Sequence, residues 1–413
     1  MQGTRWLHSK FWKNGGAMEL LFAFAITLVI AVLISGLAEE TVLSVAVLFL
    51  VSGVLIGTGV FGAPPTIDPN LLERIAEIAL FSVLFTDGMK TGGLKELRNS
   101  WRLPARALLI GMPLTIGGIA VLGRYMAGLD WPMALLIGAA LSPTDPVFVS
   151  AIFRFDAVPA RMKDLLNVES GLNDGLSLTL VVVLMARGST PGALGSLVGM
   201  PIGIATGFLI PWAGIRLEKT RFFHAAGLFD PLNAFALGLL VLATCYITNA
   251  NLFLAGFGAG ISVATFGPSF SESFREFGEL VTELLKLAAL LVLGVVIAPQ
   301  VFTTLSAIEY VFILLAVFVV RVAAVWLSLL GSGLTTKESL LTGWFGPKGF
   351  ASVVYGLLIY RAGQVHVAQL IALAVTASIV VYSSTDILIA RWFQKHGEEG
   401  KPPSVDVGGV PRA

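Results

Sequence analysis

The stretch ESGLNDG, Glu169–Gly175, places four polar side chains at the start of a long apolar run. In a helix, Glu169 and Asn173 share one stripe, and Ser170 and Asp174 share the next, about 100° further round. Ionisable groups inside a membrane helix are costly and usually mark ion or proton paths. A solvated loop or a simple helix cap is disfavoured, because the apolar run begins too soon after Asp174. The stretch therefore predicts an ion-binding face on a membrane helix.

Composition indicates a polytopic helical membrane protein. The chain has 413 residues, of which 56% are hydrophobic and only 13% charged. Soluble domains are not built this way, so we expect the chain to be surrounded by membrane lipid. The net charge of +1 gives no reason to expect a nucleic-acid partner. The single cysteine, Cys245, excludes an internal disulfide, and the four histidines lie near predicted helix ends or in tails, where they suggest no metal cluster.

Hydropathy predicts an all-α fold of about thirteen membrane spans. Their approximate bounds are 17–37, 41–61, 71–92, 104–127, 131–153, 167–187, 191–216, 230–248, 252–268, 279–302, 307–331, 337–361 and 367–393. The weakest division is the break at Asn249–Asn251, between the eighth and ninth spans. We expect residues 1–395 to form a single transmembrane unit and residues 396–413 to be a short cytoplasmic tail.

Charge predicts the orientation of the spans. Seventeen Lys and Arg residues fall in the odd-numbered loops and the C-terminal tail, against seven on the other side. Cytoplasmic loops carry the excess of Lys and Arg, so we expect the C-terminus in the cytoplasm. The basic N-terminal tail opposes this orientation.

Two predicted spans are interrupted. The fifth contains LSPTDPV, Leu141–Val147, and the twelfth contains GWFGPKG, Gly343–Gly349. Proline and glycine at these depths break a helix and free backbone groups. If the seventh span is a linker, both are fifth in sets of six, which predicts two inverted repeats with crossing broken helices. Asp145 could then compensate positive half-helix ends and Lys348 negative ones.

Three further charges lie within predicted spans. Arg321 sits among valines in the eleventh span and must have a partner, for which Glu169 is the candidate. Asp87 lies toward the cytoplasmic end of the third span, where it faces either the ion or Lys90. Lys286 is closer to a predicted helix end, so we expect its side chain to snorkel toward the interface.

These motifs together resemble those of the monovalent cation:proton antiporters, specifically the NhaP-type sodium/proton exchangers. The similar segments are SPTDP at Ser142–Pro146, ESGLNDG at Glu169–Gly175 and GPKG at Gly346–Gly349. The resemblance implies the NhaA/NhaP-like fold, in which a core bundle with two crossing broken helices moves against a dimerisation domain. It also implies a homodimer in the cell membrane.

The resemblance extends to individual residues of the predicted site. Asp174 resembles the family's ion- and proton-binding carboxylate. Ser170 and the main chain at Thr144 resemble further ligands of the transported Na⁺, and Asp145 a water-mediated one. Asp87 is similar to the family's acid in the third helix.

The supporting residues resemble the family's in most respects. Glu169 and Arg321 resemble its structural ion pair, with Asn173 beside them. The Asn-Asp order at Asn173 is similar to that of members that exchange one cation for one proton without net charge. Lys348 departs from the pattern, because arginine is usual there and lysine cannot make a bidentate contact.

A single carboxylate that binds either a cation or a proton is sufficient for electroneutral exchange. The sequence therefore predicts a secondary antiporter of H⁺ and a monovalent cation, Na⁺ before Li⁺ or K⁺, with no cofactor beyond the transported ions. The alternatives are a potassium/proton antiporter and a sodium-coupled organic-anion symporter on a related crossing-helix fold. A channel is disfavoured because the sequence contains no carbonyl filter of the TVGYG type. An enzyme is disfavoured because the sequence contains no recognisable catalytic triad or phosphate-binding loop.

Overall fold

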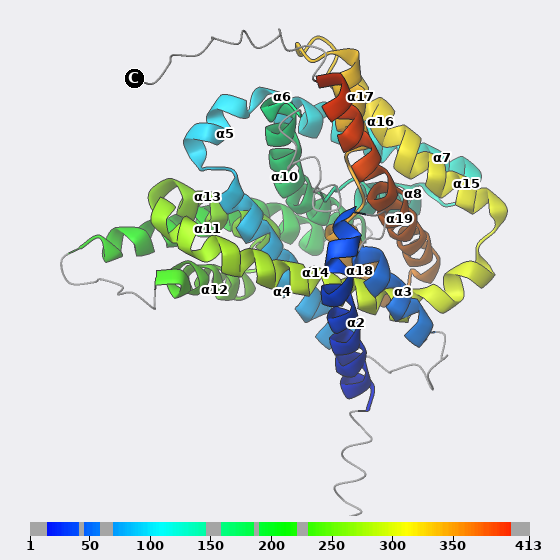
Figure 1. The fold of residues 1–413 in the computed structure, drawn as a ribbon, viewed down its shortest axis with the longest axis horizontal. Helices are drawn as coiled ribbons and strands as arrows, with labels where there is room; N and C mark the ends of the chain where they lie inside the picture. Colours follow the sequence, from blue (N-terminus) through cyan, green and yellow to red (C-terminus); the bar gives the residue numbers. More distant parts are fainter. Residues whose placement is uncertain are drawn as a thin grey trace, which may run out of the picture.

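The computed structural model describes residues 15–40, 45–57, 69–145, 158–185, 190–220 and 230–397, and every regular element in these ranges is a helix (Figure 1). The helices are α2 (Gly15–Glu40), α3 (Val45–Gly57), α4 (Pro69–Lys90), α5 (Leu94–Ser100), α6 (Arg102–Arg106), η1 (Ala107–Gly111), α7 (Met112–Met126), α8 (Trp131–Leu141), α10 (Ala160–Met185), α11 (Thr190–Glu218), α12 (Asp230–Thr248), α13 (Leu252–Phe266), α14 (Pro268–Thr304), α15 (Ala307–Leu315), η4 (Ala316–Val320), α16 (Arg321–Ser328), α17 (Thr336–Trp344), α18 (Phe350–Arg361) and α19 (Val365–Gly397). This confirms the all-α membrane fold class.

The number of membrane spans stays a prediction. Within the described ranges, five helical segments are long and apolar enough to cross a membrane by length and composition. They are Arg102–Met126, Ala160–Met185, Leu197–Glu218, Ala307–Ser328 and Val365–Tyr382. Several shorter apolar helices accompany them, among them α8 and α18, which belong to the interrupted spans.

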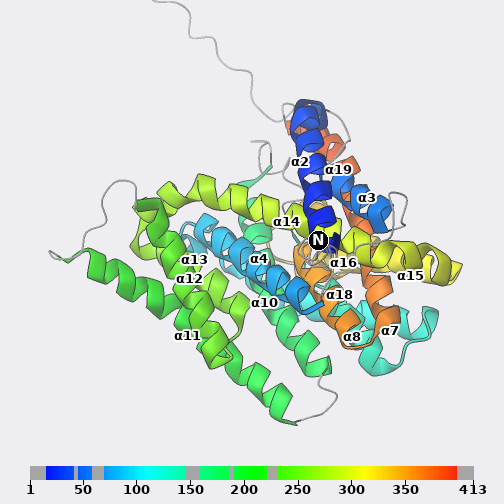
Figure 2. The same cartoon turned by 90° about the horizontal axis from the view of Figure 1, so that it is seen from below.

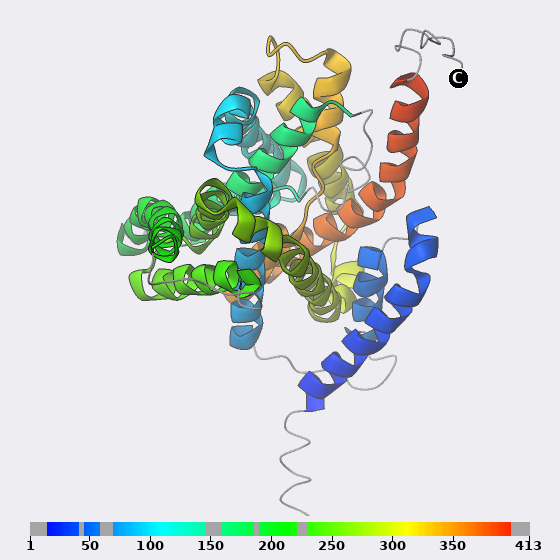
Figure 3. The ribbon, with the colours of Figure 1, turned by 60° about the vertical axis from the view of Figure 1, so that its left-hand side comes forward.

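Contacts divide the described helices into two bundles. The flanking bundle comprises α2, α3, α4, α11, α12, α13 and α14. The crossing bundle comprises α6, η1, α7, α8, α10, α15, η4, α16, α17, α18 and α19, and the short helix α5 contacts both. Figures 1 and 2 show α11, α12 and α13 on one side of the molecule and α7, α8 and α15 on the other. At the edge of the flanking bundle, α2 (darkest blue) packs against α3 (Figure 3). The bundles meet where α10, α18 and α19 pack against α4, α13 and α14.

Glycines bring the helices of the flanking bundle unusually close. A Cβ atom on Gly260 of α13 would lie 2.1 Å from the carbonyl oxygen of Phe85, and one on Gly88 of α4 would lie 2.3 Å from that of Phe257. Small residues let helix backbones approach in this way within a membrane. The contact fixes the end of α4 that carries Asp87.

The two interrupted spans meet at their breaks. The helix α8 ends at Leu141, and α17 and α18 are separated by residues 345–349. The backbone N–H of Asp145 donates a 2.9 Å hydrogen bond to the carbonyl of Pro347, which joins the two breaks. Two broken helices were predicted from these segments, although Pro146 and Val147 lie outside the described residues. The relation of the two halves as inverted repeats, with α11 as linker, stays a prediction.

One helix boundary differs from the prediction in a way that matters for the site. The helix α10 begins at Ala160 rather than near residue 167, so the Glu169–Asp174 stretch lies in its interior and not at its start. Met162, Leu165 and Leu166 are buried on the added turns, which explains why the helix begins earlier. The predicted break at Asn249–Asn251 is confirmed, since Asn251 caps the start of α13.

Candidate functional site

The interior of α10 carries four buried polar side chains on neighbouring stripes. Glu169, Ser170, Asn173 and Asp174 are each at most 6% exposed. The spacing of the motif therefore produces the predicted polar face, and packing of both bundles against α10 removes it from solvent.

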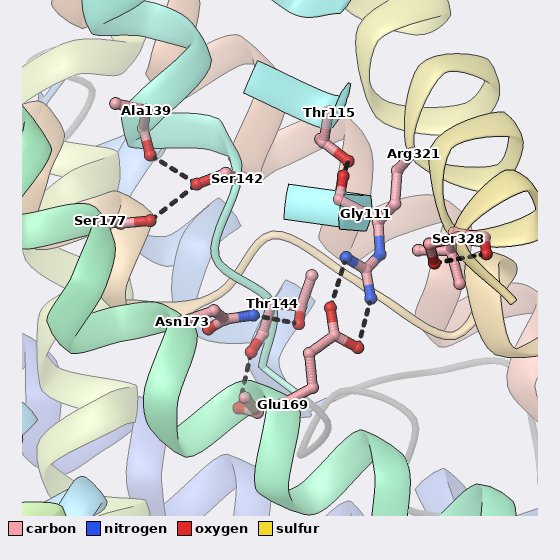
Figure 4. Close-up of polar contacts among 12 residues, drawn as sticks. Gly111, Thr115, Ala139, Ser142, Thr144, Glu169, Asn173, Ser177, Arg321 and Ser328 are labelled. Atoms are coloured by element: carbon pink, nitrogen blue, oxygen red, sulfur yellow. Dashed lines mark hydrogen bonds and ion pairs between the residues drawn. The ribbon is translucent and has the colours of Figure 1, made fainter. Parts of the chain in front are cut away.

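Two of these side chains hold the first helix break. The Ser170 hydroxyl donates a 2.7 Å hydrogen bond to the Thr144 carbonyl. The Asn173 side-chain amide donates a 3.1 Å hydrogen bond to the Thr144 hydroxyl (Figure 4). Nearby, the hydroxyls of Ser142 and Ser177 lie 2.7 Å apart. The non-helical segment that ends α8 is thus fixed along α10.

Asp174 lies beside this contact with one carboxylate oxygen unused. Among the described residues, its buried Oδ1 has no hydrogen-bond donor. Its backbone carbonyl accepts a hydrogen bond from the Tyr355 hydroxyl of α18. The charges that act on the carboxylate are those of Asp145, Asp87 and Lys286. A buried carboxylate with a free oxygen is chemically suited to bind either a proton or a small cation.

Asp145 stands at the crossing of the two breaks. Its Oδ2 accepts a 3.4 Å hydrogen bond from the backbone N–H of Phe350, the first residue of α18. A carboxylate at a helix N-terminus is favourable because the helix dipole is positive there. This placement agrees with the predicted compensation of a positive half-helix end. Gly349 makes the approach possible, since a Cβ there would lie 2.0 Å from the Asp145 Cβ.

Lys286 corrects a prediction. Its side chain does not snorkel: the residue is 2% exposed, and its Nζ lies 3.4 Å from Asp145 Oδ1. The predicted span began at residue 279, but α14 begins at Pro268, which places Lys286 in the middle of a 37-residue helix. The first turns of α14 are polar, so hydropathy does not predict that the helix begins there.

Asp87 contacts Lys90 and also belongs electrostatically to the site. The Lys90 Nζ lies 3.5 Å from Asp87 Oδ1 and 3.6 Å from Glu279 Oε1. The carboxylate of Asp87 is buried, and the charges of Lys286 and Asp145 act on it as well. Whether Asp87 binds the transported ion stays a prediction.

Glu169 and Arg321 form the predicted contact. The Arg321 guanidinium donates two hydrogen bonds to the carboxylate, of 3.1 and 3.3 Å, between side chains that are both buried (Figure 4). The second break packs on the guanidinium, because a Cβ on Gly346 would lie 1.7 Å from Arg321 Nε. The ion pair therefore joins α10, α16 and the α17–α18 break.

Lys348 is fully buried at this second break. Its backbone N–H donates a 2.6 Å hydrogen bond to the Ser378 hydroxyl of α19. Its Nζ has no hydrogen-bond partner among the described residues, although the charges of Arg321 and Glu169 act on it. The structure thus places Lys348 beside the ion pair and not among the candidate ion ligands.

Two contributions to the site were missed from the sequence. Tyr355 bonds to the backbone of Asp174, and Ser352 donates a 2.8 Å hydrogen bond to the Ala140 carbonyl at the end of α8. Both lie in the apolar run of α18, where nothing distinguishes them from ordinary polar residues of a membrane helix. Their spacing of three residues is the one available signal, because it places both on one helix face.

A cavity of about 320 Å³ lies further along α10. Leu178 and Thr179, one turn beyond Asp174, form part of its wall, together with Glu77 of α4 and Tyr246 of α12. The Tyr246 hydroxyl donates a 2.8 Å hydrogen bond to Glu77. Asn251 also lines the cavity, and its side-chain amide donates a 2.9 Å hydrogen bond to the Thr179 hydroxyl.

Comparison with known proteins identifies the family. A family model described as the transmembrane part of sodium/hydrogen exchangers matches residues 21–394. The chain belongs to the sodium/hydrogen exchanger family. This confirms the resemblance inferred from the sequence motifs.

Curated relatives within this family are antiporters. The chain is 27% identical over 384 residues to the K⁺/H⁺ antiporter NhaP of Alkalimonas amylolytica, covering 89% of this chain and 65% of that protein. It is 24% identical over 357 residues to the K⁺/H⁺ antiporter NhaP2 of Shewanella sp. strain MR-4, covering 82% of this chain and 60% of that protein. A shorter match, 34% identical over 131 residues, covers 32% of this chain and 22% of the Na⁺/H⁺ antiporter ApNhaP of Aphanothece halophytica. The chain thus spans 60 to 65% of the length of the first two relatives.

A solved structure of this family has the same fold. The sodium proton antiporter MjNhaP1 of Methanocaldococcus jannaschii, determined at pH 8, superposes with a TM-score of 0.74. The match covers 94% of this chain and all of that chain, at 18% sequence identity. The predicted NhaP-like architecture is therefore confirmed at the level of the fold.

Proposed function

We propose that this protein is a secondary active antiporter that exchanges one monovalent cation for one proton by alternating access. The observation that carries the proposal is Asp174, a buried carboxylate with one oxygen that has no donor among the described residues. It lies between contacts to both broken helices, since its neighbour Asn173 bonds to Thr144 and its own carbonyl bonds to Tyr355. Membership of the exchanger family supports the same activity. The chain is then a transporter and not an enzyme, and it uses no cofactor besides the ions that it transports.

Asp174 is the group that changes ligand in this proposal. It binds a proton or a cation but not both, since each neutralises the same charge. Ser170, the Thr144 carbonyl and Asp145 are the proposed further oxygen ligands, which suit a hard monovalent cation. Movement of the crossing bundle against the flanking bundle then exposes the site to each side in turn.

Acidic side chains lie at two levels along α4. Asp87 and Glu77 are both on α4, ten residues and thus about 15 Å apart along the helix axis. Asp87 is close to Lys90, whose side chain is partly exposed, while Glu77 lines the cavity at the other end. We infer that these two acids mark the approaches of the cation from the two membrane faces.

We propose sodium as the transported cation, with potassium or lithium as the alternatives. The sequence favours sodium, whereas the two relatives that match most of this chain are named as K⁺/H⁺ antiporters. Those names support potassium as the second candidate. The reported relatives are all named as antiporters, which gives the organic-anion symporter no support.

The family and the apolar helices indicate where the protein lies in the cell. The chain is a multi-pass membrane protein. We place it in the cell membrane with its C-terminus in the cytoplasm, on the charge asymmetry of its loops. Assembly as a homodimer stays a prediction.

The proposal is tested by proton flux in proteoliposomes, with sodium, potassium, lithium and choline chlorides supplied in turn. The wild-type protein should show cation-dependent proton flux, and the cation that supports it identifies the cargo. Asp174→Ala should abolish that flux while the purified protein remains monodisperse. Asp164→Asn removes an exposed acid from the same helix and should retain exchange. Cation-dependent flux retained in Asp174→Ala would refute the central role of this carboxylate.

A further inference from the structure

Lys286 is a buried cation that touches the candidate ion site from the opposite bundle. It lies on α14 of the flanking bundle, whereas its partner Asp145 lies beyond the end of α8 in the crossing bundle. Both side chains are less than a tenth exposed. Movement of one bundle against the other must therefore stretch or break this ion pair.

The charges around Lys286 are those of the candidate site itself. The carboxylates that act on it are Asp145, Asp87 and Glu283, and its own charge acts on Asp174. The contact between α14 and α4 is fixed one turn earlier, where the hydroxyls of Thr282 and Thr86 lie 3.2 Å apart. The ammonium is thus held among the acids that would attract a transported cation.

A protein ammonium and a transported Na⁺ or K⁺ are chemically similar competitors, since each is a monovalent cation that seeks carboxylate oxygens. A cation that approaches Asp174 is repelled by the charge of Lys286, and this repulsion is strong where water is excluded. Conversely, a bound cation neutralises the acids that hold Lys286 in place. Cation binding and the Lys286–Asp145 ion pair should therefore oppose each other.

We propose that Lys286 is a tethered competitor of the transported cation, which sets the cation affinity and holds the two bundles together at Asp145 until a cation binds. This inference rests on the proposed exchange at Asp174. Lys286 acts through Asp145 and the field at Asp174, so it is a positioning and affinity-setting residue rather than a ligand.

Two substitutions separate the charge of Lys286 from its packing. Lys286→Gln keeps a hydrogen-bond donor for Asp145 but removes the charge, and Lys286→Arg keeps the charge. In proteoliposomes at a fixed alkaline pH, Lys286→Gln should lower the apparent KM for the transported cation by roughly fivefold or more, as for other coupled sites. Lys286→Arg should keep the wild-type KM. Lys219→Met removes an exposed lysine just after the end of α11, whose Nζ donates a 2.8 Å hydrogen bond to the Phe266 carbonyl, and should leave the KM unchanged.

A binding measurement separates failure of this inference from failure of the proposed function. Cation-induced thermal stabilisation in detergent reports binding without transport. Lys286→Gln should reach half-maximal stabilisation at a lower cation concentration than the wild type, even if no flux is found. The inference would be overturned if Lys286→Gln left unchanged, or raised, both the KM and the cation concentration that gives half-maximal stabilisation. If that variant does not fold, a lowered KM in Lys286→Arg would overturn it equally.

Discussion

The buried ion pair of Glu169 and Arg321 stabilises the folded protein next to the candidate ion site. Each is buried, and the bidentate contact leaves neither charge exposed to solvent. Removing one partner from a buried ion pair leaves an uncompensated charge and costs about 3–5 kcal/mol. Glu169→Gln and Arg321→Met should therefore each lower the thermal unfolding temperature in detergent.

The double variant should recover part of this loss, because it leaves no buried charge alone. The measurement is a double-mutant cycle of unfolding temperatures, with the cation midpoint followed in the same samples. Strictly additive losses would show that the two side chains act independently. A changed cation concentration at half-maximal stabilisation, with an unchanged unfolding temperature in the absence of cation, would assign the pair to ion binding instead.

This ion pair could be predicted from the sequence, whereas that of Lys286 could not. An arginine in the middle of an apolar run must have a partner, and Glu169 was the acid without another assigned role. Hydropathy predicts Lys286 near a helix end, because the polar first turns of α14 do not register as part of a membrane span. Its partner comes from the other bundle, and tertiary contacts of that kind leave no trace in hydropathy.

At the scale of elements, a main-chain hydrogen bond joins the two helix breaks, and a glycine allows them to come this close. Gly349 has extended backbone dihedrals that other residues adopt, so an alanine there is not strained by its backbone. The added methyl would nevertheless overlap Asp145, whose Cβ lies 2.0 Å from the ideal position. The methyl must therefore displace Asp145 from the start of α18.

Gly349→Ala should destabilise the protein by about 1–3 kcal/mol, the usual cost of overpacking, and should slow exchange. The measurements are the thermal unfolding temperature and proton flux in proteoliposomes. Gly117→Ala is the matched control, since an added Cβ in α7 meets no atom within 4 Å. Equal behaviour of the two alanine variants would show that the close approach at Gly349 has no mechanical role.

The breaks themselves were predictable because proline, glycine and a charge at mid-span are each unfavourable in a membrane helix. Their mutual contact was expected only through analogy with transporters of repeated architecture. The hydrogen bond from Asp145 to Pro347 shows that the breaks touch, although the two residues are 202 positions apart in the sequence (347 minus 145). The serine and tyrosine of α18 that complete the contact had no distinguishing pattern.

At the scale of the whole molecule, the exchange stoichiometry follows from the number of groups that change ligand. Asp174 is the one carboxylate assigned to the cycle, and its neighbour Asn173 is neutral. One carboxylate that releases a proton and accepts one cation moves no net charge across the membrane. The transport equilibrium should then depend on the two ion gradients alone.

The measurement is the null point, the ratio of ion gradients at which net proton flux in proteoliposomes is zero. An imposed membrane potential should leave this ratio unchanged if exchange is electroneutral. If one net charge crossed per cycle, 100 mV would contribute about 2.3 kcal/mol and shift the ratio about fiftyfold. The potential must be clamped with an ionophore whose ion is not the transported cation. A null point that moves with potential would reveal a second proton carrier, and Lys286→Gln would then show whether that carrier is the buried ammonium.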